Sequence, residues 1–77
     1  MPDSATERLV LTRMRVARGW SRSELARRAR MTPADVGKIE AGRLVPYDSQ
    51  LRKLARALGV RSDEAGRLLL REPEARA

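Results

Sequence analysis

The sequence predicts an all-α fold, a compact bundle of about five short helices. Apolar residues recur at a spacing of three to four in several short segments, and capping residues or glycines bound these segments. No alternating strand pattern and no internal repeat is apparent. At 77 residues the chain has room for one domain with a single modest core. We expect residues 1–6 to be a flexible N-terminus, residues 7–71 to be the folded domain and residues 72–77 to be a flexible tail.

The first helix is expected over residues 7–18. Its apolar face consists of residues at positions 10, 14 and 17, with Leu11 beside them, and Gly19 ends it. Trp20 follows directly and precedes a serine that can cap the next helix. At that position the indole can pack on Leu25 as a hydrophobic staple.

Residues 20–42 predict two further helices joined by a tight turn. The second helix spans residues 21–29, and the third has Pro33 at its first helical position and stops at Gly42, after about residue 41. Each begins with its own capping box of the S/T-x-x-D/E type, Ser21 with Glu24 and Thr32 with Asp35. Their first role is structural, because a serine or threonine cap stabilises a helix by about 1 kcal/mol without any ligand.

A fourth helix is expected after a loop at residues 43–46. Asp48 or Ser49 caps it, and Gly59 ends it. Its apolar face is formed by Leu51, Leu54, Ala55 and Leu58.

A fifth helix should begin at Ser62 or Asp63 and stop before Pro73. It contains three consecutive leucines, Leu68, Leu69 and Leu70. They cannot all face inward on one helix, so at least one should be exposed. The exposed part is either a dimer or partner surface, or simply the end of the core.

The composition excludes several classes of protein. Without cysteine or histidine, the chain has no disulfides, no thiolate metal site and neither the commonest general base nor the commonest zinc ligand. It also has no glycine-rich phosphate loop. We therefore expect no enzyme, no metal site and no cofactor. The N-terminus lacks the features of a signal peptide, and no apolar run approaches the ~18 residues of a membrane span. We expect a cytoplasmic, nucleoid-associated protein with no membrane contact.

The positive charge lies in the first three quarters of the chain. Residues 1–56 carry 13 basic and 6 acidic residues, whereas residues 57–77 carry four of each. Such a basic body is typical of proteins that bind a polyanion, although an arginine-rich solvated surface would give the same count. Together with the two capped helices, the charge favours a helix-turn-helix that binds double-stranded DNA.

The third helix offers few side chains to base edges. At 100° per residue, Val36, Ile39 and Glu40 fall on one side. The opposite side carries Ala34, Gly37, Lys38 and Ala41, flanked by Pro33 and Asp35. Lys38 can donate to guanine O6 and N7, and an alanine can contact a thymine methyl. Much of any sequence preference must therefore come from elsewhere, including DNA shape.

The order of four segments resembles a known family of DNA-binding domains. The segments are LTRMR, RGWSRSELA, TPADVGKIEAGR and LARALGV, and the series is similar to the Xre/Cro type of helix-turn-helix domain of phage repressors and many bacterial regulators. The resemblance covers about residues 9–60. It implies a lambda repressor-like bundle of five helices that represses or activates transcription as a homodimer on a palindromic operator.

The resemblance also implies roles for individual residues. Those at phosphate-contacting positions are Arg22, Thr32 and Arg43, and those at base-contacting positions are Pro33, Ala34 and Lys38, with Gly37 on the same face. Arg15 and Glu40 match an internal pair that ties the first helix to the third.

Two departures from the family pattern matter for the mechanism. Pro33 and Ala34 replace residues that often hydrogen-bond to bases, and Tyr47 stands where the family often has a serine cap. The sequence thus predicts a DNA-binding transcriptional regulator, most simply a repressor. The alternative is an antitoxin or adaptor that uses this fold to bind a partner protein.

Overall fold

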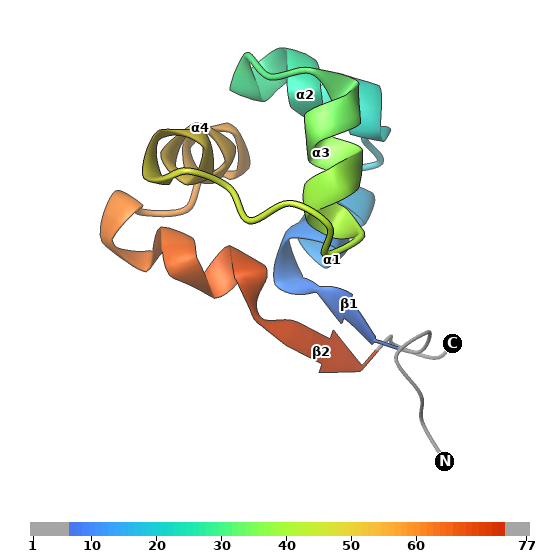
Figure 1. The fold of residues 1–77 in the computed structure, drawn as a ribbon, viewed down its shortest axis with the longest axis vertical. Coiled ribbons are helices and arrows are strands. Elements are labelled where there is room, and N and C mark those ends of the chain that lie inside the picture. The colour runs from blue at the N-terminus through green and yellow to red at the C-terminus, as the bar shows by residue number, and fades with distance from the viewer. Residues whose placement is uncertain (1–6, 74–77) are drawn as a thin grey trace.

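Five helical segments and two short strands form residues 7–73, the part of the chain that the computed structural model describes (Figure 1). Their order is β1 (Glu7–Leu9), α1 (Val10–Ala17), α2 (Arg22–Ala29), α3 (Pro33–Glu40), α4 (Asp48–Leu58), the 3-10 helix η2 (Ser62–Leu69) and β2 (Arg71–Pro73). The predicted all-α bundle of about five helices is confirmed, because each strand has only three residues.

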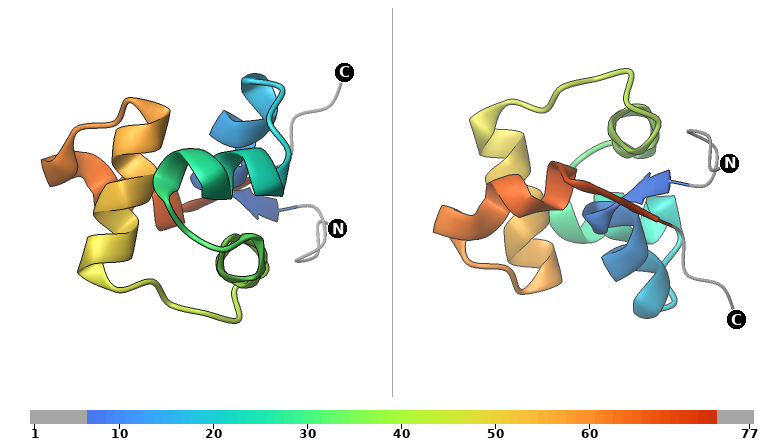
Figure 2. Two further views of the ribbon diagram at one scale, coloured as in Figure 1. Left: turned by 90° about the horizontal axis from the view of Figure 1, so that it is seen from above. Right: turned by 90° about the horizontal axis from the view of Figure 1, so that it is seen from below.

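The two strands correct the expectation that the chain contains none. They pair antiparallel, with Glu7 opposite Pro73 and Leu9 opposite Arg71. Figure 2 shows them side by side at the edge of the helices. Three residues are too few to show the alternation by which a strand is recognised in a sequence. As a result α1 begins at Val10 instead of residue 7.

The sheet also changes the predicted domain boundary. Residues 72 and 73 were expected in a flexible tail, but they pair with residues 7 and 8 across the sheet. The remaining expected flexible segments, residues 1–6 and 74–77, lie outside the described residues.

The core receives side chains from nearly every element. Its buried members are Leu9, Leu11, Leu25, Ala26, Ala29, Val36, Ile39, Leu54, Ala55, Leu58, Ala65 and Leu68. Residue 17, expected on the apolar face of α1, is exposed instead. In the last turn of α1 it is Arg15 that turns inward, to the carboxylate of Glu40.

The predicted starts of α2 and α3 are confirmed. The Ser21 hydroxyl accepts from the backbone N–H of Glu24 at 3.0 Å, and the Thr32 hydroxyl accepts from that of Asp35 at 3.1 Å. Helix α4 begins one residue earlier than expected, with Tyr47 at the cap position. The Tyr47 N–H donates to the side-chain oxygen of Gln50 at 2.9 Å, which replaces the expected aspartate or serine cap.

Four helices end with the same backbone turn, in which one residue adopts a left-handed conformation. Three of these residues are glycines, with φ of 71° at Gly19, 77° at Gly42 and 74° at Gly59. At the end of α2 the position is held by Arg30, with φ of 57°. A side chain is disfavoured in this conformation, so Arg30 occupies it at an energetic cost.

The fifth predicted helix forms as the 3-10 helix η2, and it packs on α4 and α1. Leu68 is buried, Leu69 is half-buried and Leu70 is 58% exposed. The three leucines therefore have different environments. Leu68 belongs to the core and cannot serve as a dimer surface, whereas Leu70 faces solvent. Within residues 7–73, no helix has the length and apolar character needed to cross a membrane.

Candidate nucleic-acid interface

Helix α3 packs against α2 and presents its opposite side to solvent (Figure 2). Its inner side carries Val36 and Ile39, both fully buried. On the outer side Pro33, Ala34 and Lys38 are exposed, and Gly37 is half-buried. The outer surface therefore consists of backbone, small side chains and one long cation, which allows close approach of a broad polyanion.

The end of α3 fixes the position of Arg43. The N–H of Arg43 donates to the carbonyl of Lys38 at 2.8 Å, and the N–H of Gly42 donates to that of Ile39 at 3.0 Å. These two bonds define a Schellman motif, which requires the positive φ of Gly42. Arg43 thus follows the helix in a defined turn with its side chain exposed.

Two helix starts contribute donors to this surface, Thr32 at the start of α3 and Arg22 near its end, beside Glu40. Thr32 is exposed, and because its oxygen accepts from Asp35, its hydroxyl proton can still be donated outward. Arg22 is the first residue of α2 and its side chain is 56% exposed. Both lie where the positive ends of the helix dipoles favour an anion.

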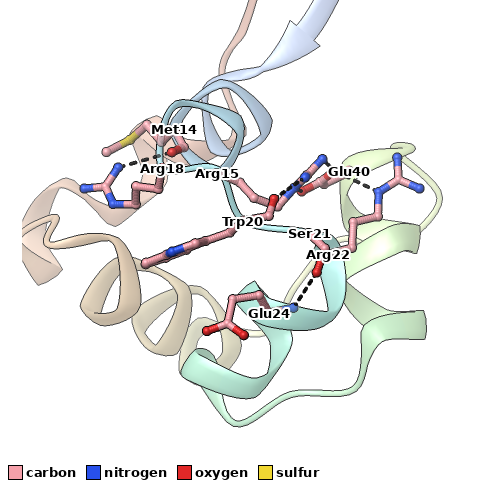
Figure 3. Close-up of polar contacts among 8 residues, drawn as sticks. All are labelled: Met14, Arg15, Arg18, Trp20, Ser21, Arg22, Glu24 and Glu40. Atoms are coloured by element: carbon pink, nitrogen blue, oxygen red, sulfur yellow. Dashed lines mark hydrogen bonds and ion pairs between the residues drawn. The ribbon is translucent and has the colours of Figure 1, made fainter.

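A buried carboxylate holds this surface from behind (Figure 3). The Glu40 side chain is 1% exposed and accepts from Arg15 Nε at 2.8 Å and Arg15 Nη2 at 3.0 Å. Arg22 Nε also donates to it, at 3.1 Å. A carboxylate this deeply buried needs such charged donors, because an unpaired ion in the interior is strongly unfavourable.

Arg15, which binds Glu40, also orders the turn before α2. Arg15 Nη1 donates to the backbone carbonyl of Trp20 at 2.8 Å. The Trp20 ring packs partly buried against the core, and the guanidinium of Arg28 lies over it at 4.3 Å from the ring centroid. The tryptophan therefore packs on the core with a cation over its ring, and its expected contact with Leu25 stays a prediction.

Glu24 is the acidic residue of the first turn of α2. It accepts hydrogen bonds from Arg27 and Arg28, which lowers the pKa of its carboxyl. Among the described residues no hydrogen bond from the Ser21 N–H to this carboxylate is found, so only the serine half of the expected capping box forms.

The structure brings the sequence-predicted residues onto three adjoining elements: the start of α2, the whole of α3 and the turn that follows it. These residues are Arg22, Thr32, Pro33, Ala34, Gly37, Lys38 and Arg43. Arg15 and Glu40 lie directly behind them. Sequence reasoning missed the bond between Arg22 and Glu40, since these residues are 18 positions apart and no local pattern connects them.

The sequence analysis also missed two exposed apolar side chains beside this surface. Val45 and Tyr47, in the loop after Arg43, are 82% and 75% exposed. An aromatic residue in a proline-containing loop was the available signal, but it was interpreted only as a poor helix cap.

Comparisons with known proteins agree with this geometry. Residues 8–73 match the family described as "Helix-turn-helix domain". The chain is also 36% identical over 63 residues to "Multiprotein-bridging factor 1" of Schizosaccharomyces pombe, an alignment covering 78% of this chain. The chain spans 43% of that relative's length. No solved structure matches the chain.

Proposed function

Because the chain belongs to the helix-turn-helix domain family, we propose that it regulates transcription by binding double-stranded DNA with α3 in the major groove. One observation carries this proposal. The outer side of α3 is exposed and bears small side chains and Lys38, while the cations Arg22 and Arg43 lie near its C-terminal end and an ion pair fixes it from inside. A surface of this form suits a helix that must lie deep in a groove between two phosphate backbones.

The residues divide between two tasks. Arg22, Thr32 and Arg43 bind phosphates and supply most of the affinity, since phosphate contacts displace condensed counterions. Lys38 is the polar contact to base edges, where it donates to guanine. Pro33 and Ala34 offer only apolar contact, as to a thymine methyl, and Gly37 lets the backbone come close.

Sequence preference then rests largely on DNA shape. A single polar side chain on α3 cannot distinguish a site of several base pairs. The sequence-dependent width and flexibility of the duplex supply the remaining discrimination.

The protein acts as a homodimeric repressor on a palindromic site. Leu70 supports a self-contact, because it is a large apolar side chain at the end of η2 with 58% of its surface exposed. Equilibrium sedimentation should give a dimer for the wild type and a monomer for Leu70→Glu. A wild-type monomer, with and without DNA, would exclude this part of the proposal.

The central experiment is selection of duplexes from a randomised pool, followed by fluorescence anisotropy over a salt series. We expect selected duplexes to bind more tightly than shuffled ones and all affinities to fall steeply with salt. Failure to bind any duplex at low salt would refute the proposal.

A second function has its own support. The relative's printed name describes a protein-bridging factor, and Leu70, Val45 and Tyr47 are exposed apolar side chains. The chain would then serve as an adaptor that binds a partner protein, with or without DNA. A stoichiometric partner that remains bound after nuclease treatment, and that Arg43→Ala does not release, would favour this function.

A further inference from the structure

A basic hollow lies between the end of α2, the middle of α4 and the start of η2. Its open volume is about 690 Å³, and it is lined by Arg28, Ala29, Arg30, Arg52, Lys53, Arg56 and Ser62. It shares no residue with the candidate nucleic-acid interface. Figure 1 shows α4 beside the end of α2.

The lining is strongly unbalanced in charge. It contains five cations and no carboxylate. Arg28 is paired with Glu24 at 2.6 Å and Arg52 with Asp48 at 3.6 Å, both on their own helices. Within residues 7–73 no ion pair is found for Arg30, Lys53 or Arg56. Like charges gathered on one concave surface repel each other, so the hollow favours an anion.

Helix ends explain only part of this cluster. Arg28 and Arg56 lie in the last turns of α2 and α4, where cations stabilise the negative end of the helix dipole. Lys53 lies in the middle of α4, so its position has no such cause.

Arg30 provides an independent indication. Where α1, α3 and α4 end, glycine holds the left-handed position, whereas α2 ends with Arg30 at φ 57°. An arginine here is less stable than a glycine and directs a guanidinium to the hollow. Strained backbone residues cluster at ligand-binding sites in other proteins, and this one lies beside a cluster of cations.

We propose that the basic hollow binds a short chain of linked phosphates, either free tripolyphosphate or the triphosphate of a nucleotide. The arginine forks match phosphate oxygens in pairs, and the Ser62 hydroxyl supplies a further donor. The hollow has a size typical of small-ligand sites. Because Ala29 is its one apolar residue and it has no aromatic side chain, it offers no anchor for a base or for an apolar side chain of a peptide.

The test compares two variants that each remove two positive charges. Lys53→Ala/Arg56→Ala changes the hollow, and Arg61→Ala/Arg67→Ala removes two exposed cations outside it. Calorimetric titration with sodium tripolyphosphate should show that the hollow variant binds at least about tenfold more weakly than wild type. The control should stay within about twofold of wild type, since Arg61 and Arg67 do not line the hollow and each is already paired with a carboxylate. Circular dichroism should show that both variants fold.

A third variant separates binding from folding. Arg30→Gly should raise the thermal midpoint while weakening tripolyphosphate binding. Equal loss of binding in both double variants, or no tripolyphosphate binding by the wild type, would overturn the proposal.

Two further ligands identify the source of the phosphates. Equal affinity for tripolyphosphate and a nucleoside triphosphate is expected from a lining without an anchor for a base, and it assigns recognition to the phosphate chain. Tighter nucleotide binding supports the hollow, with a nucleotide as the source, when the hollow variant loses it, and contradicts the proposal when the hollow variant keeps it. If the hollow variant loses affinity only for duplex DNA, the hollow is a second DNA surface and the proposal fails. DNA binding through α3 is measured separately with Arg43→Ala, so each proposal can fail alone.

Discussion

Arg15 and Glu40 are joined by two hydrogen bonds that tie α1 to the end of α3. The bond from Arg22 brings the start of α2 to the same carboxylate. Three helices therefore converge on one buried side chain, directly behind the surface proposed to enter the groove. The orientation of α3 is thus set from inside the domain before any DNA is present.

Glu40→Ala should be strongly destabilising. It leaves the largely buried Arg15 guanidinium without its partner, which costs about 3 kcal/mol in the free energy of unfolding. Urea unfolding followed by the fluorescence of Trp20 measures this. Arg61→Ala, which breaks an exposed pair, should cost at most about 1 kcal/mol. Similar losses in the two variants would show that the buried carboxylate has no special role.

Two glycines on and beside α3 should respond in opposite directions to alanine. Gly42→Ala forces a side chain into φ 77° and should destabilise the domain by about 1 kcal/mol. Gly37→Ala lies within the helix, where an added Cβ meets nothing within 4 Å, and should stabilise it by about 0.5–1 kcal/mol. Thermal unfolding gives both values.

Gly37→Ala also tests the groove-facing surface. If the backbone of α3 approaches the bases, this variant binds DNA more weakly although it is more stable. Unchanged affinity for the selected duplex would place Gly37 outside the contact.

Lys38→Ala and Arg43→Ala each remove one exposed cation but should affect DNA binding differently. Loss of Arg43 should weaken all duplexes about equally and reduce the salt slope by about 0.9. Loss of Lys38 should reduce discrimination at one base pair by about 1–3 kcal/mol. Binding measured base by base at several salt concentrations separates these effects, and identical behaviour of the two variants would rule out the division. Arg22→Ala should resemble Arg43→Ala, with an added loss of stability from its bond to Glu40.

Acid should weaken the domain in part through Glu24. The hydrogen bond from Arg27, and then that from Arg28, lowers the pKa of this carboxyl from 4.5. Since the folded-state pKa is the lower one, the stabilisation is present above the unfolded-state pKa and is lost as the pH falls through the folded-state value. An NMR titration should place the Glu24 midpoint below 4.5, and Arg27→Ala should raise it. If Arg27→Ala leaves the titration midpoint of Glu24 unchanged, the hydrogen bond from Arg27 is not the cause of the lowered pKa.

The helix boundaries were predictable where their causes are local. Ser21, Thr32 and Gly42 act within four residues of the helix ends that they determine, so the sequence alone showed α2 and α3. The strands were not predictable, because Glu7 and Pro73 pair across nearly the whole chain and each strand lacks a pattern of its own. The 3-10 geometry of η2 was likewise absent from the prediction, since a spacing of three to four does not separate it from an α-helix.

The two candidate sites also differ in how far the sequence could predict them. The outer side of α3 follows from helical periodicity and could be derived in advance. The basic hollow combines residues from positions 28–30, 52–56 and 62, which only the packing of α2 on α4 brings together. The sequence indicated an excess of positive charge but could not show that this charge converges on two separate surfaces.

The pairing of Glu7 with Pro73 has a topological consequence. Because the first and last described residues are neighbours, the backbone between them nearly forms a closed ring. The fold should therefore depend on the contacts between the helices more than on their order along the chain. A circular permutant that joins the strands through a short linker and opens at Val45 would keep the packing of α2 on α3 and of η2 on α4. Its polypeptide ends would then emerge beside the proposed groove surface instead of beside the sheet.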